Sequence, residues 1–181
     1  MSKFYMSDLH FDHKNVISYD NRPFYNVEEM NKTLIDNWNS VVTKNDCVYI
    51  LGDMFWNNNN AENILSQLNG QKYLIRGNHD RLNSSMEKYF VWVKDYAEIK
   101  DNDRTVVLCH FPMPCFKNQY YGDFHLYGHV HNGFEWHMIE HFKQEIINLY
   151  EKPCNMFNVG CMISYMNYTP RTLDEIIYTN E

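Results

Sequence analysis

Five short polar clusters, each directly after an apolar run, constrain this chain more than any other feature of its sequence. They are Asp8-Leu9-His10, Gly52-Asp53, Gly77-Asn78-His79-Asp80, His110 and Gly128-His129-Val130-His131. Open α/β sheets gather their sites at the carboxyl ends of strands, so clusters far apart in the chain can converge at one edge. Because residues i and i+2 of an extended segment point to one side, Asp8 with His10, and His129 with His131, are each predicted to offer two ligands in one direction.

The residue types in these clusters are those of a metal centre. Carboxylates, imidazoles and one amide oxygen form a borderline-to-hard donor set that suits Mn²⁺, Fe or Zn²⁺ better than Ca²⁺, and no Cys or Met falls among them. The glycines at 52, 77 and 128 suit sharp exits from strands beside a crowded site. Each cluster alone has a simpler interpretation, as a hydrogen-bonded core histidine, a turn or a helix N-cap. Only the joint pattern favours a site.

Short apolar runs alternate with helical patterns, which indicates an α/β architecture in a single domain over residues 1–181. The predicted strands are Phe4–Met6, Cys47–Leu51, Tyr73–Ile75, Val91–Val93, Tyr96–Ile99, Thr105–Cys109, Phe124–Tyr127 and Met156–Val159. A capping box of Asn26 and Glu29 predicts a helix with Met30, Leu34 and Trp38 on its buried stripe. Further helices are expected over Ala61–Leu68 and Trp136–Tyr150, and Leu173–Tyr178 is a helix or a strand.

Composition narrows the class of protein. The net charge is −7, without a Lys/Arg cluster, so extended nucleic acid is not an expected partner. No apolar run reaches the length of a membrane span and the start has no secretory pattern, so we expect a cytoplasmic protein without a membrane partner. Five cysteines without CxxC spacing indicate free thiols. Aromatic residues make up 16% of the chain, which leaves a homo-oligomeric interface open.

The order of the clusters resembles the calcineurin-like metallophosphoesterases, whose motif string reads Asp-x-His, Gly-Asp, Gly-Asn-His-Asp/Glu, His, Gly-His-x-His. Here the string is complete between positions 8 and 131. The chain is also similar to the small bacterial and phage phosphoesterases of this family in residues 7–13, 21–24 and 158–160. It departs from them at Cys161-Met162, where an acidic residue often follows Gly160, and at Phe134–Tyr150, which matches no part of the pattern.

This resemblance implies a four-layer α/β/β/α sandwich with two mixed sheets and a pair of divalent metal ions, Mn, Fe, Zn or Ni. By the family pattern one metal takes Asp8, His10 and His131, the other takes Asn78, His110 and His129, and Asp53 bridges them. The implied reaction is hydrolysis of a phosphomonoester or phosphodiester by in-line attack of a metal-bridging hydroxide. Two divalent cations bring more positive charge than two carboxylates neutralise, and the excess suits an anionic phosphate.

The resemblance also implies roles for residues that are not ligands. His79 is expected to be catalytic, stabilising developing charge or protonating the leaving oxygen, with Asp80 orienting its imidazole; Asp80 as the N-cap of the next helix is the alternative. His13, Asn15 and Arg22 are candidate contacts to the substrate phosphate, and a solvated loop is the alternative. Arg22 can instead pair with Glu28 or Glu29. The remaining histidines, at 125, 137 and 141, lack ligand spacing and are predicted to be structural.

The expected partner is a small phosphorylated substrate. Loops 11–26, 54–60, 111–122 and 132–155 are rich in Phe, Tyr, Trp and Asn, which suits a nucleotide-like diester or, equally, simple packing. Two other functions compete with hydrolysis of such a substrate. A non-catalytic interaction module on the same scaffold tends to lose a ligand, whereas here none is missing. A nuclease needs a basic strip beside the metals, and the charge pattern argues against one.

Overall fold

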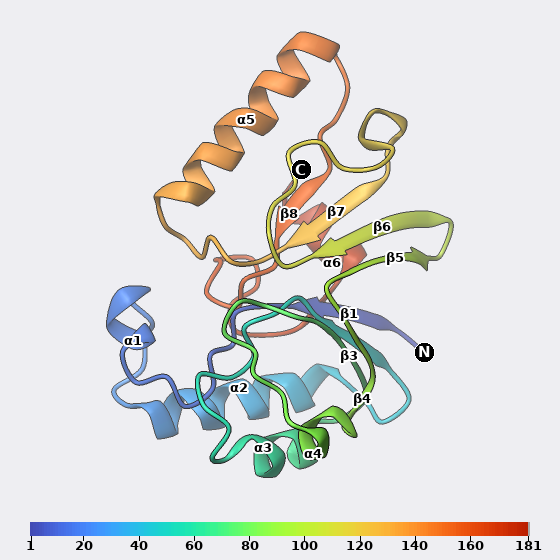
Figure 1. Ribbon diagram of the computed structural model, residues 1–181. Coiled ribbons are helices and arrows are strands. Elements are labelled where there is room, and N and C mark those ends of the chain that lie inside the picture. Colours follow the sequence, from blue (N-terminus) through green and yellow to red (C-terminus); the bar gives the residue numbers. More distant parts are fainter. Residues whose placement is uncertain (181) are drawn as a thin grey trace.

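Two mixed β-sheets stack on each other in the computed structural model, which describes residues 1–180 (Figure 1). The first sheet has the order β4-β3-β2-β1-β9, with β1 (Lys3–Met6), β2 (Cys47–Ile50), β3 (Gln71–Ile75), β4 (Phe90–Lys94) and β9 (Arg171–Thr172). The second has the order β5-β6-β7-β8, with β5 (Tyr96–Asp101), β6 (Arg104–Cys109), β7 (Phe124–Tyr127) and β8 (Met156–Asn158). Strands β1 to β4 are mutually parallel, as are β6 to β8. Strand β9 pairs antiparallel with β1, and β5 pairs antiparallel with β6.

Helices cover the outer sides of the two sheets. The helical segments are α1 (Val16–Tyr19), α2 (Val27–Val41), α3 (Ala61–Gln67), α4 (Ser84–Glu87), α5 (Phe134–Tyr150), α6 (Leu173–Tyr178) and the 3₁₀ turn η1 (Gln119–Tyr121). In Figure 1, α2, α3 and α4 lie beneath the first sheet and α5 stands over the second. The layers are therefore α/β/β/α, and the predicted fold class is confirmed.

Helix α2 shows how directly the sequence specifies a local element. The Asn26 side chain accepts a hydrogen bond from the Glu29 N–H at 2.8 Å, which satisfies a free donor in the first turn. The Glu29 carboxylate accepts from the Tyr25 N–H rather than from Asn26, so the capping box is displaced by one residue. Met30, Leu34 and Trp38 are fully buried, as their helical spacing predicts.

The hydrophobic core is divided unequally. The larger part lies between the sheets and beneath the first sheet, and includes Tyr5, Met6, Leu126 and Phe157. A smaller cluster fills the space between the second sheet and α5. Of the 17 residues of α5, Ile146 alone is buried, so this helix rests on the sheet through a narrow stripe.

The predicted long elements are present, and Leu173–Tyr178 is a helix. A full capping box between Thr172 and Glu175 begins it. The segments not predicted are α1, α4, η1 and β9, each of four residues or fewer and too short for a hydrophobic period to show. In the part of the chain that the structure describes, no helix is long and apolar enough to cross a membrane.

Backbone hydrogen bonds join the loops at the carboxyl ends of both sheets. The Asp8 N–H donates to Gly52 O at 3.0 Å, which ties the loop after β1 to the loop after β2. In the second sheet the Gly128 N–H donates to His110 O at 2.9 Å. The Ser7 N–H donates to Val159 O at 2.8 Å and so links one sheet to the other. This arrangement brings the polar clusters of the sequence to one place.

Candidate metal centre at the strand ends

One group of candidate ligands joins the loops after β1 and β7. The Nε2 atoms of His10 and His131 lie 3.1 Å apart, and His131 Nε2 lies 3.7 Å from Asp8 Oδ1. One donor atom from each of these three residues lies within 4.8 Å of the other two. This is the trio that the family pattern assigns to a single metal. Asp8 and His10 are fully buried, so the donors are held out of bulk water.

A second group joins the loops after β2, β3, β6 and β7. Donor atoms of Asp8, Asp53 and His110 lie within 4.8 Å of one another. The Asn78 side-chain oxygen lies 3.0 Å from His110 Nε2 and 2.9 Å from His129 Nδ1. Asp53 Oδ2 is 3.6 Å from His110 Nε2 and 3.8 Å from His10 Nε2, so its carboxylate stands between the two groups. All seven predicted ligands therefore converge.

The backbone brings the paired ligands together in a way that differs from the expectation. Asp8, His10, His129 and His131 all have positive φ, at 55°, 52°, 72° and 46°, and so are not in an extended strand. Asp53 has φ 53° as well. A left-handed backbone at a residue other than glycine costs about 1–3 kcal/mol and persists where the surroundings enforce it, often at functional sites. The pairs converge through these turns, and the strand-alternation argument was wrong.

The glycines of the motifs allow close approach of the chain to the ligands. A Cβ atom at Gly77 would lie 2.2 Å from Asp53 Oδ1, and one at Gly128 would lie 2.5 Å from Asp8 Oδ2. Gly52 combines a positive φ of 91° with a Cβ position only 2.4 Å from His110 Nδ1. Any side chain at these positions would displace a candidate ligand.

Hydrogen bonds to the far ring nitrogens set the tautomers of two histidines. His110 Nδ1 lies 2.7 Å from the Leu51 carbonyl oxygen, which can only accept, so Nδ1 carries the proton. His131 Nδ1 donates to Asp20 Oδ1 at 2.8 Å. Nε2 of each ring then faces the cluster, which is the arrangement of histidines that bind metals. Asp20 was not predicted; only its place between two predicted contacts, Asn15 and Arg22, pointed toward it.

Charge within the cluster moves the pKa values of its members in opposite directions. Burial lowers the pKa of His10 to about 2, and the neighbouring His131 adds to this effect. Burial would also lower the pKa of His110, but the hydrogen bond to Asp53 and the charge of Asp8 raise it to about 9. Although burial opposes it, the contact with His110 lowers the pKa of Asp53 to about 2, so Asp53 is a carboxylate. Buried carboxylates, an amide oxygen and imidazole nitrogens facing one another fit a divalent transition metal.

A cleft of about 310 Å³ opens over the candidate ligands. His79 lies at its edge with 40% of its side chain exposed and its Nε2 3.9 Å from Asp53 Oδ2. The His79 N–H donates to Asp53 Oδ1 at 2.8 Å, which fixes the residue beside the cluster. Trp56, which was not singled out from the sequence, lies with its ring centroid 5.0 Å from that of His79.

The prediction that Asp80 orients the imidazole of His79 is wrong. The Asp80 carboxylate accepts from the backbone N–H groups of Asp53, Met54 and Gly77 at 2.8–2.9 Å. No hydrogen bond among the described residues joins it to the ring of His79, and the N-cap of α4 is Asn83. Asp80 is thus a positioning residue that ties the loop after β2 to the loop after β3.

The three predicted substrate contacts have different outcomes. His13 lines the cleft and is largely buried. Asn15 is not among the residues that line the cleft, and its backbone oxygen accepts from Ser18. Arg22 is buried, and its guanidinium donates to Asp20 Oδ2 and to the carbonyl oxygens of Leu9 and Asp8 at 2.9–3.0 Å. Arg22 therefore supports the loop that carries the ligands, and the prediction that it contacts phosphate is wrong. A phosphate contact by Asn15 remains a prediction.

Glu28 and Glu29, the alternative partners predicted for Arg22, are also wrong, because Arg22 pairs with Asp20.

Cys161, at the position where the resemblance breaks, is fully buried with its Sγ 3.1 Å from Asp8 O. Burial raises the pKa of the Cys161 thiol to about 12, so this residue packs as a neutral thiol beside Arg22. This departure from the family pattern lies behind the candidate metal ligands rather than in the cleft.

The histidines predicted to be structural lie away from the cleft. His125 is fully buried beneath the loop after β6 and packs against Phe116. His137 stacks on Trp136, and His141 pairs with Glu145 on the exposed side of α5.

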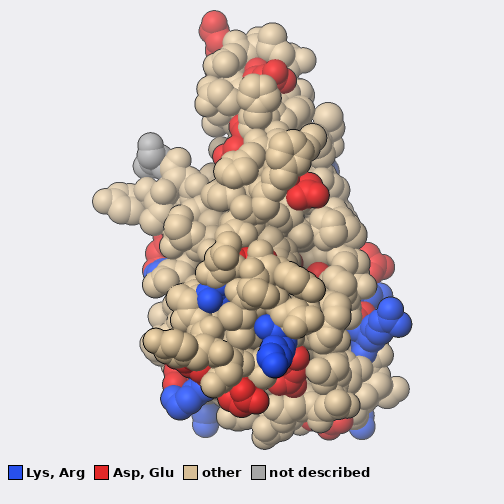
Figure 2. Space-filling view, turned by 90° about the vertical axis from the view of Figure 1, so that its left-hand side faces the viewer, with Lys and Arg blue, Asp and Glu red and all other residues tan. Residues whose placement is uncertain are grey.

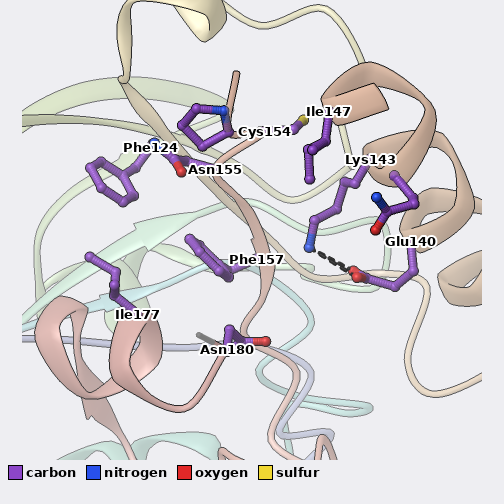
Figure 3. A pocket seen from close by; sticks show the side chains of 11 residues that line it. Phe124, Glu140, Lys143, Ile147, Cys154, Asn155, Phe157, Ile177 and Asn180 are labelled. Carbon is purple, nitrogen blue, oxygen red and sulfur yellow. Dashed lines mark hydrogen bonds and ion pairs between the residues drawn. The ribbon is translucent and has the colours of Figure 1, made fainter. Parts of the chain in front are cut away.

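A second hollow, of about 500 Å³, lies between α5, the β7–β8 edge and α6 (Figure 3). Phe124 and Phe157 form its floor, and Lys143 extends from α5 toward Glu140. The Lys143 Nζ lies 3.0 Å from Glu140 and 5.3 Å from the centre of the Phe157 ring. Its charge is thus compensated within the protein. Neither group of candidate metal ligands borders this hollow.

Comparisons with known proteins agree with this geometry. Residues 4–96 match the calcineurin-like phosphoesterase family. An uncharacterized protein of Methanocaldococcus jannaschii, MJ1445, is 40% identical over 181 residues, covering 98% of this chain and 90% of that protein. The Gene 66 protein of Mycobacterium phage L5 is 40% identical over 80 residues, which span 42% of this chain and 38% of the phage protein. Among solved structures, a protein of unknown function from Aquifex aeolicus, AQ665, has the same fold, with a TM-score of 0.74, 24% identity and coverage of 98% of both chains.

Proposed function

The chain belongs to the calcineurin-like phosphoesterase family, and from this premise we propose that it is a metal-dependent hydrolase of phosphomonoesters or phosphodiesters. The observation that carries the proposal is the convergence of donor atoms from five loops at one cleft, with the Nε2 atoms of His10 and His131 only 3.1 Å apart. Two imidazole nitrogens this close together, beside the buried carboxylates of Asp8 and Asp53, are placed to bind a shared cation.

We assign one ion to Asp8, His10 and His131, and a second to Asn78, His110 and His129. Asp53, whose carboxylate stands between the two groups, is the proposed bridge. The chemistry that two divalent cations supply at such a site is activation of a water for in-line attack on phosphorus, with neutralisation of the developing charge. The ion is Mn, Fe, Zn or Ni, the metals that this donor set suits.

The protein's own contribution to the chemistry is positioning and proton transfer. His79 is held by its backbone bond to Asp53 and exposes its imidazole to the cleft, where Nε2 can donate a proton to the leaving oxygen. Asp20 and Leu51 hold the protons on the far sides of His131 and His110, so the near sides stay free to bind. Asp80 holds the loop that carries Asp53.

The competing functions have weaker support. A nuclease would track a phosphate backbone with cationic side chains. Among the described residues that line the cleft, none is Lys or Arg. On the side of the molecule from which α1 projects, Lys and Arg lie mainly in the lower half and are interspersed with Asp and Glu (Figure 2). An interaction module would have no need of the complete ligand set.

Hydrolysis of a substrate panel tests the proposal. Protein purified with reductant, as five free cysteines and the proposed cytoplasmic location require, is assayed with Mn²⁺ against bis-p-nitrophenyl phosphate, p-nitrophenyl phosphate and cyclic nucleotides. We expect metal-dependent turnover of at least one ester, and its abolition by chelator and by Asp53→Asn. Turnover that survives chelation, or no turnover with any of several metals, would contradict the proposal.

A further inference from the structure

The cleft has an aromatic wall next to the candidate metal ligands. The indole of Trp56 stacks on the imidazole of His13, with ring centroids 3.8 Å apart and planes inclined by 6°. His13 covers one face of the indole, yet 46% of Trp56 remains exposed. A single exposed aromatic side chain needs no functional explanation. Trp56 differs because it borders the cleft and lies beside His79, the proposed proton donor.

A second aromatic side chain extends the same wall. Tyr19, on α1, lines the cleft and is 71% exposed. Its ring meets that of His13 edge-on, with centroids 6.1 Å apart and planes inclined by 73°. Val16 from the same short helix also lines the cleft. The wall therefore presents aromatic and aliphatic side chains to solvent, in contrast to the floor formed by Asp53 and the histidines.

The backbone holds Trp56 in place. Its N–H donates to Phe11 O at 3.0 Å, in an extension of the pairing between Phe11 and Phe55. Phe11 and Phe55 are both buried beneath it. The loop that carries Trp56 is thus attached to the loop that carries Asp8 and His10. A planar group placed on this wall would stand at a defined position relative to the phosphate site, which is what specificity requires.

We propose that Trp56 is a specificity-determining residue that stacks on a planar ring attached to the substrate phosphate. The substrate class is an aryl or heterocyclic phosphate ester, such as a nucleoside phosphate, rather than an alkyl ester or a polyphosphate. The absence of Lys and Arg among the described cleft-lining residues supports this class, because further phosphates would find no cationic side chain there. Stacking on aromatic side chains tolerates any base, since every base has a π-face. This inference rests on the proposed function.

Binding of two phosphonates that differ only in the ring tests the inference without turnover. Phenylphosphonate and methylphosphonate carry the same phosphonate group and a carbon–phosphorus bond that a phosphoesterase does not cleave. Titration calorimetry with Mn²⁺-loaded protein should show phenylphosphonate binding about tenfold more tightly, within the usual range for stacking on an aromatic side chain. Trp56→Ala should reduce this ratio to near unity. Trp56→Phe should retain most of it, and Tyr178→Ala, an exposed tyrosine on α6, serves as a matched control.

Several outcomes overturn the inference. Equal affinity of the two phosphonates for the unaltered protein does so, as does the absence of binding by either. If Trp56→Ala and Trp56→Phe weaken both ligands by the same factor, Trp56 only supports His13. The inference and the proposed function can fail separately. A protein that prefers phenylphosphonate but hydrolyses no ester would support the role of Trp56 and contradict the proposed reaction. A protein that hydrolyses esters without this preference would contradict only the role of Trp56.

The position of the ring is resolved by a pair of diesters with a common leaving group. Phenyl p-nitrophenyl phosphate and methyl p-nitrophenyl phosphate both release p-nitrophenolate, so their rates differ only through the group that stays on phosphorus. If Trp56 stacks on that group, kcat/KM should favour the phenyl ester, and Trp56→Ala should remove the preference. If calorimetry shows the preference and these rates do not, the ring that stacks is the leaving group.

Discussion

Histidines are buried in two regions of this molecule, and the two regions treat them in opposite ways. Beneath the loop after β6, both ring nitrogens of His125 are satisfied by the backbone: Nδ1 donates to Val107 O at 3.2 Å, and Nε2 accepts from the Met113 N–H at 3.0 Å. Among the candidate ligands, Nδ1 of His110 donates to the Leu51 carbonyl oxygen and Nδ1 of His131 donates to the Asp20 carboxylate. Their Nε2 atoms face other acceptors. Burial is common to both regions, so it does not identify a site; the convergence of ring nitrogens with buried carboxylates does.

The pKa values follow the same division. Burial lowers the pKa of His125 to about 4, and the acceptor Val107 O offsets only part of that shift. His110 is as deeply buried, yet its pKa is raised to about 9 because Asp53 and Asp8 are close. Two carboxylates in a dry environment create a strong demand for positive charge. A proton on His110 is one way to meet it, and a metal ion is another.

Replacement of the Asp53 carboxylate should remove the charge that distinguishes the candidate metal centre from the surroundings of His125. In Asp53→Asn, both groups of candidate ligands lose the charge that stands between them, so we expect both metal sites to weaken and hydrolysis to be lost. Elemental analysis of the metal-replete protein measures the first effect. Asp36→Asn, on the exposed side of α2, is the matched control. An Asp53→Asn protein that retains two ions per chain would show that Asp53 is not the bridge.

The second prediction separates catalysis from binding within the cleft. His79→Ala should keep both metals and lower kcat by about 10²–10⁴-fold, the range of general acid–base groups. The defect should be smaller for p-nitrophenyl esters, whose leaving group needs little protonation. His141→Ala, on exposed α5, should change neither quantity. Loss of a metal from His79→Ala would make His79 a ligand, and unchanged turnover of every substrate would remove it from the mechanism.

The third prediction concerns His125, which is buried beneath the loop after β6. The folded-state pKa of His125, about 4, lies below the ordinary value of 6.5, so the unfolded chain binds a proton first as pH falls. Stability is therefore fully present above about pH 6.5 and is lost as pH falls toward 4, by about 3 kcal/mol over that window. In His125→Gln this component of the pH dependence should disappear. Urea unfolding of the metal-free proteins at pH 7 and pH 4.5 measures it, and parallel losses in both proteins would contradict the assignment.

The smallest expected effect comes from the partner of His131. Asp20→Asn should weaken metal affinity by about 10–100-fold, because residues that orient a ligating histidine act on that scale. Arg22→Lys is the control, since Arg22 pairs with Asp20 and with the carbonyl oxygens of Leu9 and Asp8, whereas Asp20 bonds the ring of His131. It should lower the melting temperature and largely spare metal affinity. Equal effects of the two substitutions on metal affinity would indicate that Asp20 acts through the loop and not through the ring of His131.

Much of the fold could be predicted because it depends on local patterns. The Met30, Leu34 and Trp38 stripe and the Asn26 cap produced α2 as expected. Apolar runs that end in polar clusters correctly located the carboxyl ends of β1, β2, β3, β6 and β7. Short elements such as α1 were missed, yet α1 supplies Tyr19 and Val16 to the cleft wall. Helices of a single turn depend on tertiary contacts for their stability and leave little trace in the sequence.

What the sequence determined by itself was the set of residues that meet, because strand ends in a mixed α/β sheet converge by topology. How they meet was decided by the tertiary structure. Left-handed turns at Asp8 and His131, the bond from His131 to Asp20, and the burial of Arg22 each depend on groups distant in the chain. The physical reason is that a hydrogen bond or a strained φ is selected by its surroundings. The sequence therefore does not distinguish a charged side chain that faces a phosphate from one, such as Arg22, that faces a buried carbonyl.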